Sequence, residues 1–111
     1  MKVAYIFAST TSQKILDLMI IPQLENGIHG ADVAGMFFFM DNAFFLLDGV
    51  DMAKRLASIQ EKNGMLLMAC DKCAIERKID DKLIKGARIG CFPTLYAALG
   101  EVGGVDQVIT L

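Results

Sequence analysis

The feature that most constrains the fold is a set of short apolar runs spread along the whole chain. Their hydrophobicity is nearly continuous instead of alternating, and they occupy residues 3–8, 31–40, 65–69, 87–89 and 107–111. A strand that is apolar at every position must be covered on both faces, as in a parallel sheet with helices on each side. The runs therefore predict buried strands.

The segments between these runs have helical periodicity. Apolar stripes at helical spacing are formed by Ile15, Leu16, Met19 and Ile20, and by Met52, Leu56 and Ile59. Ser12 and Asp48 are candidate N-caps of these two helices, and Asn63-Gly64 predicts the end of the second. Both stripes need an apolar surface to pack on, which the predicted strands supply.

Two shorter elements follow in the last third of the chain. Asp80 is a candidate cap of a short turn that ends at Gly86, and Pro93 predicts the start of a short helix that Gly100 ends. Strands that alternate with helices predict βαβ units. We therefore expect one α/β domain over residues 1–111, a three-layer α/β/α arrangement with a mostly parallel sheet of about five strands.

This topology predicts which residues can meet. In an open parallel sheet, ligands and reactive groups collect beyond the carboxyl ends of the strands. The residues expected at that edge are Ser9, Thr10, Thr11, Asp41, Asn42, the segment from Cys70 to Cys73, and Cys91. The single histidine, His29, precedes the second strand and is expected at the opposite edge. All three cysteines should therefore share one edge without a histidine.

The composition favours assembly. Hydrophobic residues make up 54% of the 111 residues and the mean hydropathy is +0.45. A domain of this size cannot bury so much apolar surface alone, so part of it is expected in a subunit interface. The apolar segment 43–47 is mostly core by default. It is also the candidate contact, because a loop there would be exposed in a monomer and would shield Cys70 when covered.

Charge and segment length exclude several classes of partner. The net charge of −2 comes without a basic block, which argues against a nucleic-acid partner. The longest apolar run, near residues 36–47, is interrupted by Asp41-Asn42 and is too short to span a membrane. An odd cysteine count and no pattern of a signal peptide fit a reducing cytoplasm. We expect a cytoplasmic protein with no membrane partner.

Cys70 is the first candidate catalytic residue. It ends a strand, and the segment from Asp71 is helix-prone, so backbone amides are expected to face its sulfur. Lys72 and Arg77 would add positive charge, whereas Asp71 would oppose a thiolate. Most free cysteines are small buried apolar residues, but this position at a strand-to-helix turn favours a functional thiol.

Cys73 is the second candidate, one helical turn further on, as a resolving thiol, a metal ligand or part of the core. Cys91 would take part only if it lies beside Cys70. A structural zinc site usually has four ligands, often from two C-x-x-C pairs, and only one such pair is present. A thioredoxin-like redox pair remains open, although no tryptophan precedes it.

The hydroxyl cluster from Ser9 to Ser12 is weighed as a phosphate site. It lacks the glycines that let a backbone wrap a phosphate, and a helix cap explains the same residues. No cofactor is therefore expected.

The motifs together resemble the DsrE/DsrF-like family of sulfur-relay proteins. The resemblance is carried by a strand that ends in cysteine, by Cys70-x-x-Cys73-Ala74-x-x-Arg77, by the segment 82–87 and by the segment 105–109. It covers essentially the whole chain. It implies an α/β/α fold, a trimer or hexamer, and a persulfide on Cys70. Cys73 departs from the best-known members, which have a single cysteine in this loop.

The function predicted from this combination is sulfur trafficking, as a sulfur carrier or sulfurtransferase. Cys70 would accept persulfide sulfur from a donor protein and pass it to an acceptor protein, with Cys73 able to close a disulfide. The alternative is a thiol–disulfide redox or metal-binding module that carries no sulfur.

Overall fold

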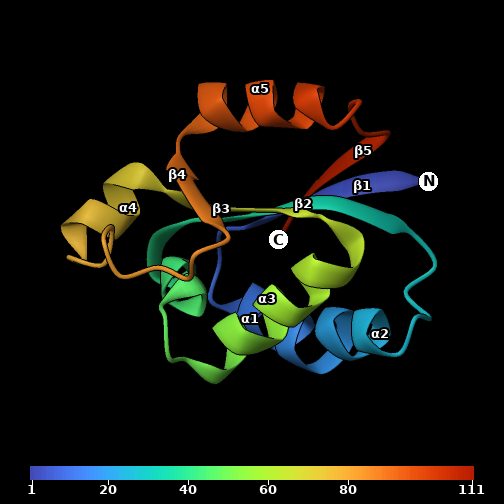
Figure 1. The fold of residues 1–111 in the computed structure, drawn as a ribbon, viewed down its shortest axis with the longest axis horizontal. Helices are drawn as coiled ribbons and strands as arrows, with labels where there is room; N and C mark the ends of the chain where they lie inside the picture. Colours follow the sequence, from blue (N-terminus) through green and yellow to red (C-terminus); the bar gives the residue numbers. More distant parts are fainter.

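Five parallel strands form one sheet in the order β4-β3-β2-β1-β5 in a computed structural model that describes all 111 residues (Figure 1). The strands are β1 (Lys2–Phe7), β2 (Asp32–Phe38), β3 (Leu66–Cys70), β4 (Ala87–Gly90) and β5 (Gln107–Thr110). Every neighbouring pair is parallel. The predicted α/β class is confirmed, and the sheet is parallel throughout instead of mostly.

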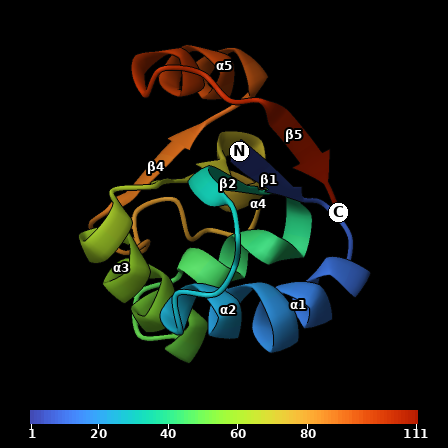
Figure 2. The same cartoon turned by 90° about the vertical axis from the view of Figure 1, so that its right-hand side faces the viewer.

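Helices cover both faces of the sheet (Figures 1 and 2). One face carries α1 (Thr11–Ile15), the π-helical segment η1 (Leu16–Ile20), α2 (Ile21–Glu25) and α3 (Asp51–Asn63). The other face carries α5 (Phe92–Glu101), and two short elements, the 3₁₀ segment η2 (Met40–Leu46) and α4 (Asp71–Glu76), follow β2 and β3. None of these helices has the length and apolar character needed to cross a membrane.

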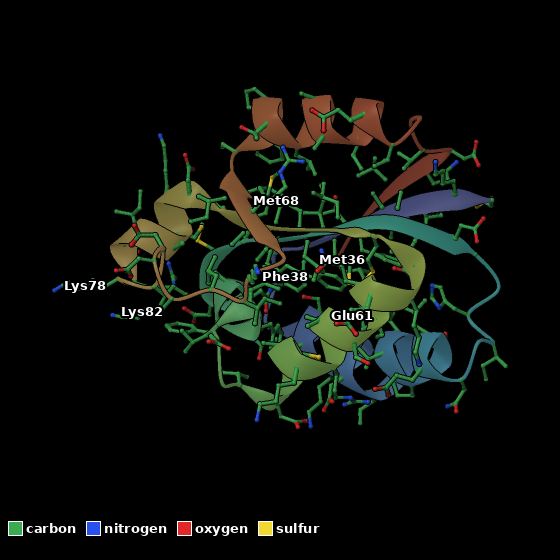
Figure 3. All side chains as sticks on the ribbon, in the orientation of Figure 1. Met36, Phe38, Glu61, Met68, Lys78 and Lys82 are labelled. Carbon is green, nitrogen blue, oxygen red and sulfur yellow. The ribbon has the colours of Figure 1, made fainter.

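The continuous hydrophobicity of the strands is explained by these two layers. Met68 points toward α5, whereas Met36 and Phe38 point into the layer of α1 to α3 (Figure 3). All three are fully buried. Phe38 stacks on Phe7 of the neighbouring strand at 5.2 Å between ring centroids. Residues that alternate along a strand therefore enter different layers, and both layers are apolar.

The predicted N-caps of the first two helices are wrong. Ser12 lies inside α1, where its amide donates to Ser9 Oγ at 3.2 Å and its hydroxyl donates to the Ser9 carbonyl. Ser9 is thus the residue that satisfies the first turn. Asp48 lies three residues before α3, and its amide donates to the carbonyl of Lys82 instead.

One of the two helix ends predicted from a glycine is confirmed. Gly64 ends α3 in the left-handed region, at φ 71°, as predicted. Pro93 lies in the first turn of α5, also as predicted. However, α5 continues through Gly100, and Gly103 and Gly104, both with positive φ, form the exit. Residues 80–86 form turns that place Leu83 opposite Leu47 in an isolated bridge.

One prediction of burial is wrong and another is confirmed. The wide turn of η1 changes the helical spacing, so Leu16 and Ile20 stay buried while Met19 is half exposed. Segment 43–47 is largely core, because Ala43 and Leu46 are fully buried, and Phe45 packs on Phe38. Phe44 alone in that segment is exposed, by 39%.

Candidate functional site: a thiol pair at the end of β3

Cys70 occupies the last position of β3 and the N-cap position of α4. Its backbone is extended, with ψ 127°, and its strand partner on β4 is Gly90. The strand ends here because Asp71 begins a helical turn. The predicted strand-to-helix position of Cys70 is therefore present, in the middle of the chain and one strand in from the edge of the sheet.

Cys73 lies in the first turn of α4, directly after that junction. Both thiols are buried, with 4% of Cys70 and 6% of Cys73 exposed. Burial raises the pKa of Cys70, hydrogen bonds from the amides of Cys73 and Lys72 lower it, and the side chain of Cys73 raises it again. Burial is the largest of these effects, so the pKa of Cys70 lies above its ordinary value. The thiol of Cys73 thus lies close enough to Cys70 to disfavour its thiolate.

Met40 covers the second thiol. Its backbone amide donates to Cys73 Sγ at 3.1 Å, and Cys73 Sγ donates to Met40 Sδ at 4.0 Å. Met40 has φ 53°, in the left-handed region, which costs a residue with a Cβ about 1–2 kcal/mol. This residue also ends the strand early, since β2 stops at Phe38 and not at residue 40. The strained turn places its amide on the thiol.

Arg77 ties this turn to α4. Its Nε and Nη2 both lie 2.9 Å from Asp41 Oδ1, and its Nη1 donates to the Cys73 carbonyl at 3.2 Å. The predicted role of Arg77 as a charge beside the Cys70 thiolate finds no contact in the structure, because the guanidinium is engaged by Asp41, the Cys73 carbonyl and Glu76. Lys72 contributes its amide, which also donates to Asp71 Oδ1 at 2.7 Å.

Cys91 lies at the carboxyl edge of the sheet, as predicted, but its hydrogen bond is made within α5. It is the N-cap residue of α5, where its carbonyl accepts from the Leu95 amide. No hydrogen bond joins Cys91 to Cys70 or Cys73, and all three cysteines are free. The chain contains no group of three or more His, Cys, Asp or Glu side chains placed to share a metal ion.

Asn42 and the hydroxyl cluster lie at the same edge and support the backbone there. The buried Asn42 amide nitrogen donates to the Ser9 carbonyl at 3.0 Å and lies 3.4 Å from Ser12 Oγ. Its Oδ1 is buried without a hydrogen-bond partner. The hydroxyls therefore serve the start of α1, which agrees with the helix-cap interpretation.

His29 lies at the amino edge of the sheet, as predicted, away from the thiols. Its Nε2 lies 2.8 Å from the Tyr5 hydroxyl and its Nδ1 lies 3.0 Å from Gln23 Oε1. Burial lowers the pKa of His29 and raises the pKa of Tyr5. The larger hollow of the molecule, about 670 Å³, is on this side and is lined by His29 and Asp32 among others. It contains neither member of the thiol pair.

Solved structures share this fold. The ychN protein from E. coli is 22% identical with a TM-score of 0.67, and the match covers 100% of both chains. MTH1491 from Methanobacterium thermoautotrophicum, a protein of unknown function, is 12% identical with a TM-score of 0.66 over 99% of this chain and 97% of its own. BT1422 from Bacteroides thetaiotaomicron, a conserved protein of unknown function, is 7% identical with a TM-score of 0.65, and the match covers 99% of this chain and 94% of its own.

No family model and no curated protein sequence matches the chain. At these identities the structural matches establish the fold and leave the chemistry to the residues of the site.

Proposed function

We propose that the protein is a cytoplasmic sulfur carrier whose sulfur resides on Cys70. The observation that carries the proposal is the buried pair of Cys70 and Cys73 at the β3–α4 junction, where the amides of Lys72 and Cys73 favour the Cys70 thiolate. The fold shared with the ychN protein and the resemblance of the motifs to sulfur-relay proteins both support it.

The chemistry requires two thiol exchange steps. The Cys70 thiolate attacks the outer sulfur of a donor persulfide, the donor's S–S bond breaks, and the donor leaves as a thiolate. Cys70 now carries a persulfide. An acceptor thiolate then attacks that outer sulfur, and Cys70 is released as a thiolate. No electrons are gained or lost by the protein across the two steps.

Backbone amides can stabilise the sulfur anion in both steps. The amides of Lys72 and Cys73 lie at the start of α4 and offset part of the burial that disfavours charge on Cys70. A buried thiol with a raised pKa also gives a more nucleophilic thiolate once it forms. Loading should therefore depend on a local opening at the site and on the pH.

Cys73 gives this site a second outcome. Its thiolate can attack the inner sulfur of the Cys70 persulfide, which forms the Cys70–Cys73 disulfide and releases hydrosulfide. The position of Cys73 in the first turn of α4, three residues after Cys70, favours this closure. The same placement supports the second candidate function, a thiol–disulfide redox protein that carries no sulfur.

The partners that fit this chemistry are a persulfide donor protein, an acceptor protein with a free thiol, and further copies of this chain. Exposed aromatic and apolar side chains near the site support a homo-oligomer. They are Met40, Phe44, Phe92 and Tyr96. Phe92 also packs on Phe39, next to Met40, so this surface adjoins the turn that covers Cys73.

The deciding experiment is intact mass measurement after exposure to a persulfide donor, with and without dithiothreitol. A carrier gains whole sulfur atoms that the reductant removes, whereas a redox protein loses two hydrogens and gains no sulfur. Cys70→Ser should abolish the gain, and the matched variant Cys91→Ser should keep it. Full sulfur loading of Cys70→Ser would end the assignment to Cys70.

A further inference from the structure

The two thiols of the pair are buried to a similar extent but have different hydrogen-bond donors. Their exposed fractions, 4% and 6%, are too similar for access to decide which sulfur reacts. Cys73 Sγ accepts the Met40 amide, which comes from outside α4, at 3.1 Å. The amides that favour the Cys70 thiolate, those of Lys72 and Cys73, belong to α4 itself, and burial outweighs their effect. The chemical difference between the two sulfurs therefore comes from their hydrogen-bond donors and surroundings.

The Met40 amide reaches Cys73 through an unusual backbone. A methionine at φ 53° is strained, and such outliers persist where surrounding contacts impose them. The contacts that impose this backbone involve the next residue, Asp41, which forms an ion pair with Arg77. The side chain of Arg77 is mostly buried, and it also donates a hydrogen bond to the Cys73 carbonyl. The ion pair thus joins the donor and the acceptor of the N–H···S bond at 3.1 Å.

We propose that the Met40 amide, positioned by the Arg77–Asp41 ion pair, stabilises the negative charge that develops on Cys73 Sγ. It makes Cys73 the leaving sulfur and Cys70 the attacked sulfur when a Cys70–Cys73 disulfide is opened. Arg77 and Asp41 are positioning residues in this step, since neither touches the reacting sulfurs.

The step is a simple displacement. An external thiolate attacks Cys70 Sγ and forms a new S–S bond. The Cys70–Cys73 bond breaks, and its electron pair goes to Cys73 Sγ, which faces the Met40 N–H. With hydrosulfide as the nucleophile, the same step leaves a persulfide on Cys70 and a thiolate on Cys73. Hydrosulfide would then load sulfur directly onto Cys70 of the oxidised protein. This consequence rests on the proposed function, whereas the order of attack on the two sulfurs does not.

The test uses glutathione, so that it does not depend on sulfur carriage. The full chain carrying Cys91→Ser is oxidised with diamide and treated with glutathione and excess iodoacetamide. Peptide mapping then shows which cysteine carries glutathione and which carries the alkyl group. We expect at least about tenfold more glutathione on Cys70 than on Cys73, the effect of one charge-assisted hydrogen bond.

Arg77→Gln and Asp41→Asn should each bring that ratio to within about threefold of equality, because the amide is no longer held on the sulfur. Arg55→Gln is the matched control, since it removes an ion-paired arginine far from the thiols and should leave the ratio unchanged. An even distribution in the parent protein overturns the proposal, and so does an unchanged ratio in both ion-pair variants.

If the ion-pair variants do not fold, hydrogen exchange of the Met40 amide in the reduced protein supplies the answer. In Cys73→Ala the amide should exchange at least about tenfold faster, because its acceptor is gone. Equal exchange in the two proteins contradicts the N–H···S bond. Loading by hydrosulfide is measured separately by intact mass, so a failure of sulfur carriage leaves the glutathione result interpretable.

Discussion

Gly90→Ala should destabilise the protein, because α5 lies against the end of β4. A Cβ at residue 90 would lie 2.6 Å from Thr94 Cβ, 2.7 Å from its Cγ2 and 2.9 Å from its Oγ1. Rotation of the threonine side chain relieves the last two contacts but cannot move its Cβ. The start of α5 must therefore shift away from β4, beside the strand that ends in Cys70.

The magnitude follows from two opposing effects. Inserting a methyl group into a packed contact costs about 1–3 kcal/mol. Replacing glycine by alanine lowers the entropy of the unfolded chain and returns about 0.4–1 kcal/mol. Residue 90 is not in the left-handed region, so no backbone strain is added. The net expectation is a loss of about 1–2 kcal/mol in the free energy of unfolding.

Gly100→Ala is the matched control with the opposite sign. Gly100 lies within α5, and a Cβ there meets no atom within 4 Å. Alanine should stabilise this helical position by about 0.5–1 kcal/mol. Urea unfolding of the two variants and the parent should give midpoints on opposite sides of the parent value. A Gly90→Ala protein as stable as the parent would refute the packing argument.

Three further predictions concern the thiol, a surface ion pair and assembly. The raised pKa of Cys70 favours the neutral thiol in the folded state, so its stabilising effect is complete below about pH 8.5 and is lost at higher pH. Urea midpoints should therefore fall more steeply above that pH in the parent than in Cys70→Ser; parallel curves would contradict this. Arg55 lowers the pKa of Glu25, so Arg55→Ala should cost about 0.2–1 kcal/mol at pH 7, and the difference should shrink as the pH falls below about 4. An unfolding difference that does not change with pH would assign the effect to packing. Phe92→Ser combined with Tyr96→Ser should delay elution in gel filtration, with the exposed Leu18→Ser as control; equal elution volumes would count against an interface on α5.

The strands and the edge of the sheet were predictable because they depend on local hydrophobicity and on topology. Continuous apolar runs predict strands to within a residue or two, as at β3, and alternation with helices predicts parallel pairing. Together these place Cys70, Cys73 and Cys91 at one edge and His29 at the other. The helix caps failed because Ser9 and Ser12 are equally good cap residues, and the backbone between β1 and α1 decides between them.

The surroundings of Cys73 were not predictable from the sequence. Met40 belongs to an apolar run, and nothing in its neighbours marks a left-handed residue, which is commonly Gly, Asn or Asp. The Arg77–Asp41 pair joins residues 36 positions apart, and it exists because α4 and η2 are neighbours. Such contacts depend on the assembled fold, so charge patterns along the chain placed Arg77 beside the wrong cysteine.

The burial of both thiols has a kinetic consequence. Reagents reach the sulfurs when the structure around them opens, so the opening rate sets an upper limit on the reaction rate. At low donor concentration the rate follows the donor, and at high concentration it levels off at the opening rate. The opening rate then sets the maximum number of exchanges that each protein molecule completes per second, even when its partners are abundant.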